Sequence, residues 1–230
     1  MNILAFEAST RHLSVALWSA GALLERSADV PNGGAERLLP WAGELIGEAG
    51  IALAQLDGIA FGAGPGGFTG LRLVCGVAQG LAFGLDCPVV PVGSLAALAL
   101  ASGDGKVIAS LDARMNEIYL AAYVVDGANV EEVMAPIVGA GETASLPEGA
   151  GWRGAGDGFS ACGALLTARL GTRLVAVDAT ASPSAAAVAR LAAPLLASGR
   201  GVAAAAAMPL YIRDKVALTT VERKARGGLR

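Results

Sequence analysis

Two observations on the sequence predict a soluble α/β protein with two domains. Short apolar strands alternate with segments of helical period along the first hundred residues, and a polar, glycine-containing stretch at 102–105 precedes a second run of strands. The chain has 230 residues, of which 54% are hydrophobic and 16% charged, so it can bury a core in one large or two small domains. We therefore expect a first domain at 1–103 and, at 104–230, a smaller second unit with a C-terminal segment.

The first domain is expected to open with a sheet and to continue with an amphipathic helix. Residues 3–7, 12–18 and 23–30 are short apolar or alternating runs separated by turn residues, which indicates an antiparallel three-strand meander. Residues 36–49 change to helical period, and Gly50 supplies a C-terminal stop. The apolar face of this helix comprises Leu38, Leu39, Ala42, Leu45, Ile46 and Ala49.

A glycine-rich turn at 62–72 is the most informative stretch of the chain. It follows a short strand at 58–61 and leads into a helix at 69–85. So many positions without side chains are typical of a loop whose backbone closely approaches a ligand or another helix. The turn lacks both the Gly-Lys-Ser/Thr of a Walker loop and the distant acid of a dinucleotide fingerprint, so we rank phosphate binding below helix packing.

The helix at 69–85 carries a stripe of glycines. Gly76, Gly80 and Gly84 are spaced four apart and fall on one face. Each lowers intrinsic helix stability by about 1 kcal/mol relative to alanine, so close approach of a second helix is expected to compensate. That helix belongs either to the same domain or to a partner protein, and the sequence leaves both alternatives open.

The remaining elements follow the same periodicities. A strand at 89–92 and a helix at 94–100, capped by Ser94, complete the first domain. The second unit is expected to contain strands at 106–111 and 118–125. Two helices are expected later in the chain, at 160–170 and 184–197.

Charge argues against strong direct binding of nucleic acid. The formal net charge is −3, so the chain has no overall basic footprint. Six of the 17 basic residues lie between Arg213 and Arg230, including Arg223, Lys224 and Arg226. We interpret this segment as a solvated or disordered tail, with contact to nucleic-acid phosphates as the alternative.

Targeting and redox signals indicate a cytoplasmic protein. The N-terminus has no basic region and meets an acid at residue 7, unlike a signal peptide, and Asp86, Pro88 and Pro91 interrupt the most apolar window before it could span a membrane. The three cysteines are not closely spaced, which favours small buried hydrophobes over disulfides or a zinc site. They are Cys75, Cys87 and Cys162.

Few residues are suited to catalysis. His12 is the only histidine and lies in a predicted strand, so a structural role is favoured and sites with two imidazoles are excluded. Glu7 and Asp112 each follow an apolar strand, where an open sheet would hold a metal-bound nucleotide. For such an isolated pair of acids, a structural role and a functional one are equally favoured.

Five short motifs, taken together and in their order along the chain, indicate a family resemblance. They are Ile3-Leu4-Ala5-Phe6-Glu7-Ala8-Ser9-Thr10, Glu36-Arg37-Leu38-Leu39-Pro40, Gly64-Pro65-Gly66-Gly67-Phe68-Thr69-Gly70-Leu71-Arg72, Asp112-Ala113-Arg114 and Pro209-Leu210-Tyr211-Ile212-Arg213. Over nearly the whole chain, this order resembles the TsaB (YeaZ) family of bacterial tRNA-modification proteins. Two departures remove side-chain donors: Gly67 stands where the family has serine, and Gly34-Ala35 where it commonly has histidine and serine.

The resemblance implies an actin-like fold of the acetate and sugar kinase, Hsc70 and actin type, with two ribonuclease-H-like lobes of which the second is reduced. It also implies a non-catalytic scaffold subunit, required with TsaD and TsaE for transfer of threonylcarbamoyl to N6 of adenosine 37 in tRNAs that read codons starting with A. The implied partners are a TsaD-like paralogue, a TsaE-like ATPase and a second copy of the chain, with tRNA reached only through the complex and no membrane. No cofactor is expected to bind this chain tightly by itself, whereas ATP or ADP with Mg²⁺ belongs to the assembled complex.

The resemblance also bears on catalysis by the chain itself. The catalytic paralogue has a His-x-x-x-His metal pair at the start of a helix, and these positions fall here on Ser94 and Leu98. Leucine cannot ligate a metal, which argues against a metalloprotease. The remaining enzymatic alternative is a small ATPase or phosphotransferase that uses Glu7 and Asp112, with 154–158 as a loose adenosine-binding candidate.

Two sets of site residues follow from the resemblance. Family knowledge places the pairing surface on the helices at 36–49 and 69–85. Candidates for this interface are Leu39, Trp41, Phe68, Arg72, Leu73, Gly76, Val77 and Gly80. A vestigial nucleotide site would comprise Glu7, Ser9, Thr10 and Asp112.

Overall fold

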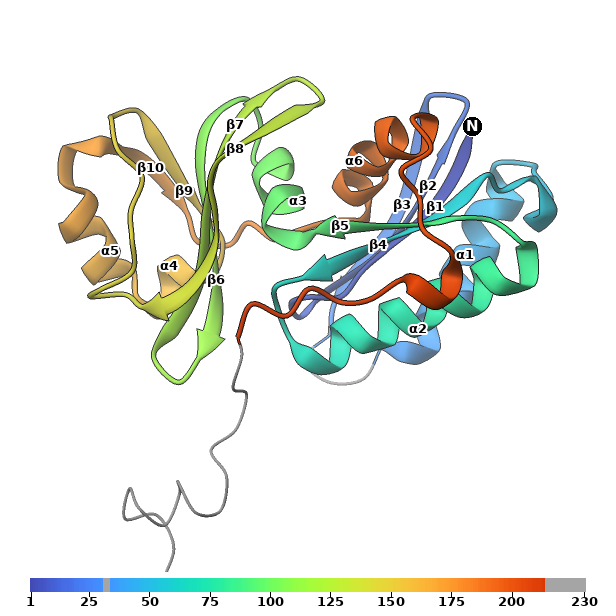
Figure 1. Ribbon diagram of the computed structural model, residues 1–230, viewed down its shortest axis with the longest axis horizontal. Coiled ribbons are helices and arrows are strands. Elements are labelled where there is room, and N and C mark those ends of the chain that lie inside the picture. Colours follow the sequence, from blue (N-terminus) through green and yellow to red (C-terminus); the bar gives the residue numbers. More distant parts are fainter. Residues whose placement is uncertain (31–33, 214–230) are drawn as a thin grey trace, which may run out of the picture.

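Two five-stranded sheets organise the molecule (Figure 1). The computed structural model describes residues 1–30 and 34–213. The first sheet has the order β3-β2-β1-β4-β5 and the second the order β10-β9-β6-β7-β8. The strands are β1 Asn2–Glu7, β2 His12–Ser19, β3 Ala22–Asp29, β4 Gly58–Gly64, β5 Val89–Gly93, β6 Gly105–Arg114, β7 Glu117–Asp126, β8 Asn129–Ala140, β9 Trp152–Ala155 and β10 Leu174–Asp178.

Both sheets have the same topology. In each, three consecutive strands form an antiparallel meander, and two later strands are added in parallel beside the first strand of that meander. The antiparallel meander predicted at 3–30 is therefore confirmed. The same arrangement recurs from β6 to β10, so the chain contains a structural repeat.

The helices agree with the predicted periodicities, with shifts at their ends. The helix predicted at 160–170 is broken at Cys162 into two pieces. The helices are α1 Ala35–Glu48, α2 Phe68–Leu85, α3 Ser94–Ala101, α4 Gly158–Ala161, α5 Gly163–Leu170 and α6 Ala185–Ala197, with short 3₁₀ turns η1 Leu53–Gln55, η2 Gly171–Arg173 and η3 Ala204–Ala206.

Strand alternation assigns the buried side chains to separate layers. In β1, Leu4 and Phe6 point into the layer covered by α1 and α2, whereas Ile3 and Ala5 point to the opposite layer. In the second lobe, Ile108 of β6 packs towards α4 and α5, and its neighbours on the strand pack towards α3. The two inner faces share one core, in which α3 and α6 form the middle layer (Figure 1).

Helix α1 has one outward residue that its periodicity did not predict. Leu38, Ala42, Leu45 and Ile46 are buried as expected, but Leu39 is 55% exposed. The apolar residues of α1 therefore continue onto its exposed side at Leu39, which is also one of the interface candidates. Its position, one residue after Leu38, turns it away from the sheet by about 100°.

Helix α2 is apolar enough to cross a membrane by length and composition alone, with a mean hydropathy of 1.4 over 18 residues. In this fold one face of α2 packs on the first sheet, and its opposite face is exposed. The buried residues are Leu71, Val74, Cys75, Ala78 and Ala82.

The C-terminal part of the chain returns to the first lobe. Helix α6, which we had placed with the second unit at 104–230, packs against β1, β2 and β4. Its first turn is held there because the backbone N–H of Ala185 donates to Ser14 Oγ at 2.8 Å, and that of Ala186 donates to Glu25 Oε1 at 2.9 Å. The second sheet itself occupies residues 105–178.

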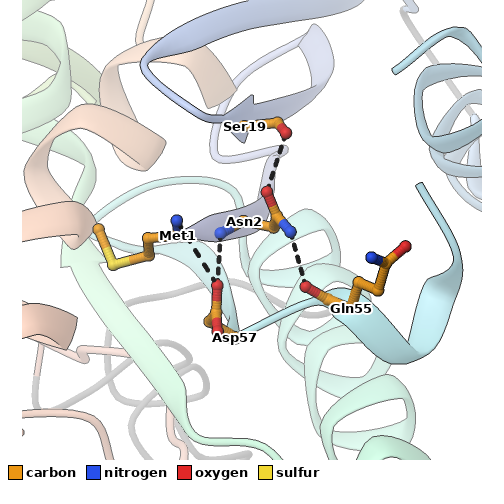
Figure 2. A network of polar contacts seen from close by, with 5 residues as sticks. All are labelled: Met1, Asn2, Ser19, Gln55 and Asp57. Carbon is orange, nitrogen blue, oxygen red and sulfur yellow. Dashed lines mark hydrogen bonds and ion pairs between the residues drawn. The ribbon is translucent and has the colours of Figure 1, made fainter. Parts of the chain in front are cut away.

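A polar network fixes the first lobe at the N-terminal end of β1 (Figure 2). The backbone N–H of Asn2 donates to Asp57 at 2.6 Å, and its side-chain amide donates to the carbonyl of Gln55 at 2.8 Å. Ser19 donates to Asn2 Oδ1 at 2.8 Å. These contacts join β1 to the end of β2 and to the loop before β4, which supports their register.

Candidate functional site

A cleft of about 650 Å³ opens between the two lobes. Its lining comes mainly from the β1–β2 loop, the turn between β4 and α2 with the beginning of α2, the β6–β7 hairpin and the C-terminal segment, and Asp157 before α4 adds to it. Of the residues proposed for a vestigial nucleotide site, Ser9, Thr10 and Asp112 line the cleft. Glu7 is not among the lining residues.

Glu7 is a buried structural carboxylate. Its Oε1 accepts a hydrogen bond from the backbone N–H of Ser9 at 2.6 Å, and its Oε2 accepts one from the hydroxyl of Ser94 at 3.0 Å. Burial raises the pKa of Glu7 above its ordinary value, and these hydrogen bonds partly oppose that effect. Both oxygens are therefore engaged inside the lobe, and the carboxylate does not face the cleft with Asp112.

Ser94 performs a different task from the predicted helix cap. Gly93 occupies the N-cap position of α3, and no side-chain cap is formed there. The Ser94 hydroxyl instead bridges Glu7 and the backbone N–H of Gly64, which donates to it at 3.2 Å. This bridge ties β1, the glycine turn and α3 together.

The glycines of the turn are needed for close packing between two loops. A Cβ on Gly62 would lie 1.8 Å from Glu7 Oε2, and one on Gly70 would lie 1.9 Å from the carbonyl oxygen of Ala8. A Cβ on Gly66 would lie 2.5 Å from Ser9. The sequence indicated close approach to a ligand or another helix, whereas in the structure the approach is to the end of β1 and to the β1–β2 loop.

The first-lobe wall of the cleft contains the hydroxyl groups of Ser9 and Thr10. Ser9 Oγ is buried and has no partner at hydrogen-bonding geometry among the described residues, whereas the backbone carbonyl of Ser9 accepts from Gly67 N–H at 2.7 Å. Thr10 Oγ1 accepts the backbone N–H of His12 at 3.1 Å. Thr10 is thus engaged in a local turn.

The second-lobe wall carries two carboxylates. Asp112 accepts hydrogen bonds from Arg114, through the backbone N–H at 2.7 Å and the guanidinium at 3.0 Å. Asp157, which lies within the loose candidate at 154–158, accepts the backbone N–H of Asp112 at 2.8 Å. Arg114, Met115 and Asn116 all have positive φ angles, so the hairpin tip is a strained turn that faces the cleft.

The loose adenosine-binding candidate at 154–158 has a packing explanation. A Cβ on Gly156 would lie 2.2 Å from the carbonyl oxygen of Ser110, and one on Gly158 would lie 2.1 Å from Ser110 Oγ. A Cβ on Gly154 would lie 2.5 Å from the ring of Phe159. These glycines let β9 and α4 approach β6.

The single histidine and the cysteines form no metal site in the described part of the chain. His12 Nδ1 lies 2.9 Å from Asp29 Oδ1 at the surface, and this contact lowers the pKa of Asp29. The three cysteines are free thiols. Among residues 1–30 and 34–213, no three His, Cys, Asp or Glu side chains are grouped so that they could hold a metal ion.

The glycine stripe of α2 faces away from its own lobe. Gly76, Gly80 and Gly84 are exposed, and a Cβ at any of them would meet no atom of residues 1–30 or 34–213 within 4 Å. Packing within the domain, one of the two alternatives, therefore does not explain the stripe. Phe68 and Arg72 extend the same row of every fourth residue, and both are exposed. We call residues 68, 72, 76, 80 and 84 the α2 stripe.

The other interface candidates divide by burial. Leu39 is exposed, whereas Trp41, Leu73 and Val77 are half-buried and pack against the core beneath α1 and α2. Phe83, beside the α2 stripe, is 84% exposed and was not among the candidates. Its place in an apolar helix gave no sign that it points outwards.

The fold and cleft define a class of protein. Two lobes of ribonuclease-H-like topology that face each other across a cleft constitute an actin-like fold. The second lobe is the reduced one, because its helices α4 and α5 have four and eight residues.

Comparison with known proteins places the chain more narrowly. The family model for TsaD, tRNA N6-adenosine threonylcarbamoyltransferase, matches residues 33–220. The tRNA threonylcarbamoyladenosine biosynthesis protein TsaB of Escherichia coli K12 is 33% identical over 94% of this chain and 96% of its own length. TsaB of Haemophilus influenzae is 41% identical over 54% of each chain.

A solved structure agrees with these sequence relatives. YeaZ from Pseudomonas aeruginosa superposes with a TM-score of 0.84 at 40% identity, over 91% of this chain and 99% of that one. The chain belongs to the TsaB (YeaZ) family of tRNA threonylcarbamoyladenosine biosynthesis proteins.

Proposed function

We propose that this chain acts in the formation of N6-threonylcarbamoyladenosine in tRNA as a non-catalytic subunit, located in the cytoplasm. In this proposal it docks a TsaD-like transferase through the α2 stripe and neighbouring parts of α1, and a TsaE-like ATPase joins the same complex. Its tRNA contacts are indirect. The basic residues Arg223, Lys224 and Arg226, for which phosphate contact was the alternative, lie outside the described residues.

The observation that carries the proposal is the exposed glycine stripe. Each of its three glycines weakens α2 by about 1 kcal/mol relative to alanine, and no contact among the described residues requires them. A helix that packs against the stripe would use the missing side chains to approach the α2 backbone closely. Docking of a partner therefore accounts for residues that the isolated fold does not need.

Neighbouring side chains supply what a docking surface requires. Leu39 of α1 and Phe68 and Phe83 of α2 are 55%, 41% and 84% exposed, so both helices present large apolar groups at the surface. On α1, Gly43 and Gly47 are also exposed with open space at their Cβ positions. Buried aromatic anchors typically dominate the free energy of such interfaces.

Two buried residues of α3 support a non-catalytic role. They occupy the positions that the resemblance assigns to the metal ligands of the catalytic paralogue. Ser94 and Leu98 are both fully buried, and the Ser94 hydroxyl is committed to Glu7. A metal ion at this place would need both ligand side chains and an open approach. This supports a subunit that assists transfer carried out by its partner.

The cleft favours one second candidate function, a small ATPase or phosphotransferase. It is large enough for a nucleotide, and Asp112 and Asp157 line it. The burial of Glu7 weighs against the pair of Glu7 and Asp112 as Mg²⁺ ligands. Titration of the purified chain with ATP and Mg²⁺ separates the two functions, because the scaffold proposal predicts weak or no binding.

Partner affinity tests the docking proposal. Isothermal titration of a TsaD-type protein should show that Gly76→Leu weakens binding roughly a hundredfold, as expected for loss of about 2–3 kcal/mol at the centre of an interface. Gly163→Leu, at the first residue of α5, is the matched control because its Cβ also meets open space. Equal affinities of wild type and Gly76→Leu would contradict the proposed surface.

A further inference from the structure

The C-terminal segment 207–213, which we call the strap, runs along α2 towards the second lobe (Figure 1). The carbonyl oxygen of Ala207 accepts hydrogen bonds from Cys75 Sγ at 3.5 Å and Gln79 Nε2 at 2.9 Å. Further along, the backbone N–H of Leu210 donates to the carbonyl oxygen of Ala63 at 2.7 Å. The first half of the strap is thereby fixed to the first lobe.

Tyr211 joins the strap to the beginning of the α2 stripe. Its hydroxyl accepts a hydrogen bond from Arg72 Nε at 2.9 Å, and its ring lies 5.9 Å from the ring of Phe68. The Arg72 guanidinium lies 3.6 Å from the centre of the Phe68 ring. These three residues form a packed cluster, in which Phe68 and Tyr211 are each about two-fifths exposed.

Arg213 reaches across to the second lobe. It forms an ion pair with Glu117 of β7, and its Nη1 lies 3.6 Å from Met115 Sδ. The Arg213 side chain is 13% exposed. Both contacts are at the β6–β7 hairpin, whose tip has the positive φ angles described above.

The strap closes the side of the cleft away from the shared core. In the part of the chain that the structure describes, the lobes are also joined by the layer of α3 and α6, and no residue of these two helices lines the cleft. Leu210, Tyr211, Ile212 and Arg213 do line it. The shared core therefore joins the lobes on one side of the cleft, and the strap joins them on the other.

We propose that the strap is a latch that couples the α2 stripe to closure of the two lobes. A partner that covers the half-exposed cluster of Phe68, Arg72 and Tyr211 stabilises the seated strap, which holds the hairpin against the first lobe through Arg213 and Glu117. By thermodynamic reciprocity, closed lobes strengthen docking by the same factor. The coupling to docking rests on the function proposed above, whereas the latch itself is a property of the isolated chain.

The latch is tested by the distance between the lobes in the isolated chain. Spin labels at Ala54→Cys and Thr167→Cys report that distance by pulsed electron resonance. Both sites are exposed, one in each lobe. Cys87 and Cys162 are replaced by alanine, and Cys75 by serine so that position 75 keeps a donor for the carbonyl oxygen of Ala207. Labelled protein is diluted with unlabelled chain so that distances between copies do not contribute.

Exchanging the charges of Arg213 and Glu117 shows whether a change in the distance between the lobes is due to their ion pair. Arg213→Glu and Glu117→Arg singly should raise the population of separated lobes roughly fivefold, and the double variant should restore the wild-type distribution. Arg190→Glu, an exposed residue of α6, is the charge-matched control and should change nothing. A wild-type distribution in both single variants, or no recovery in the double variant, would overturn the latch.

The coupling is tested separately by affinity for a TsaD-type protein. The single charge variants should bind it roughly fivefold more weakly than wild type, with recovery in the double variant. If the lobes separate but affinity is unchanged, the coupling is refuted. Loss of binding in Gly76→Leu remains a distinct result, so a failed latch does not count as failure of the docking surface.

Discussion

Replacing the three stripe glycines by alanine should stabilise the isolated chain while it weakens docking. In Gly76→Ala/Gly80→Ala/Gly84→Ala, every added methyl group points into open space, and none of the three glycines has a positive φ angle. Each alanine removes backbone entropy from the unfolded chain and should contribute about 0.5–1 kcal/mol. The triple variant should gain about 1.5–3 kcal/mol if the three sites are additive.

Thermal unfolding followed by circular dichroism measures this gain. For a chain of this size, each kcal/mol corresponds to roughly 2–4 °C, so the melting temperature should rise by about 3–12 °C. The measurement is made at a concentration where light scattering shows a monomer, because a dimer formed through the stripe would be weakened by the same substitutions. Affinity for a TsaD-type protein should fall about tenfold.

Melting temperature and partner affinity together test whether the three glycines serve docking. A lower melting temperature would mean that the glycines serve the chain's own packing. A stabilised chain with unchanged affinity would mean that the stripe is not a docking surface. Opposite changes in stability and affinity are expected for an interface that requires glycine.

Three further substitutions test individual contacts. Gly70→Ala should destabilise the chain by about 2–4 kcal/mol in urea unfolding, since its Cβ would lie 1.9 Å from the carbonyl oxygen of Ala8; wild-type stability would contradict this. Glu7→Gln should flatten the pH dependence of the free energy of unfolding. Because folding raises the pKa of Glu7, the wild type loses stability as pH rises from about 4.5 through the pKa of the folded state. An unchanged slope would exclude Glu7 as the source of this dependence. Ser184→Ala should cost about 1 kcal/mol, since its hydroxyl accepts the Ala187 N–H at 3.1 Å, and Ser160→Ala, at an exposed site, is its control.

Local pattern predicted the first lobe well because its elements are fixed by neighbouring residues. The period of α1, its end before Gly50 and the run of short strands before it are all readable within windows of about fifteen residues. The strands β8, β9 and β10 were not predicted. In β10, Val175 and Val177 are both exposed at the edge of the sheet, so the strand lacks the alternation that marks a half-buried strand.

Long-range contacts account for what the sequence did not predict about the C-terminal part. The return of α6 depends on the contact between Ala185 and Ser14, which are 171 residues apart. The pairing of Arg72 with Tyr211 spans 139 residues. In neither pair do the residues next to one partner in the sequence indicate which distant residue it contacts.

In the candidate site, too, local pattern predicted some features and long-range contacts determined the others. The glycines at 76, 80 and 84 were correctly placed on one face, but only the structure shows that this face is exposed. Glu7 and Asp112 both follow apolar strands, yet the first is buried and the second lines the cleft. A carboxylate at a strand end does not reveal whether nearby hydroxyl groups, here that of Ser94, have already engaged it.

The most direct test of the central claim is modification of tRNA in a reconstituted system. Mass spectrometry would quantify N6-threonylcarbamoyladenosine formed by the adenylate-forming enzyme with TsaD-type and TsaE-type proteins, in the presence of wild-type chain, Gly76→Leu or no chain. The proposal predicts modified adenosine with the wild-type chain and little with Gly76→Leu or without the chain. Full modification without the chain would contradict its role as a required docking subunit.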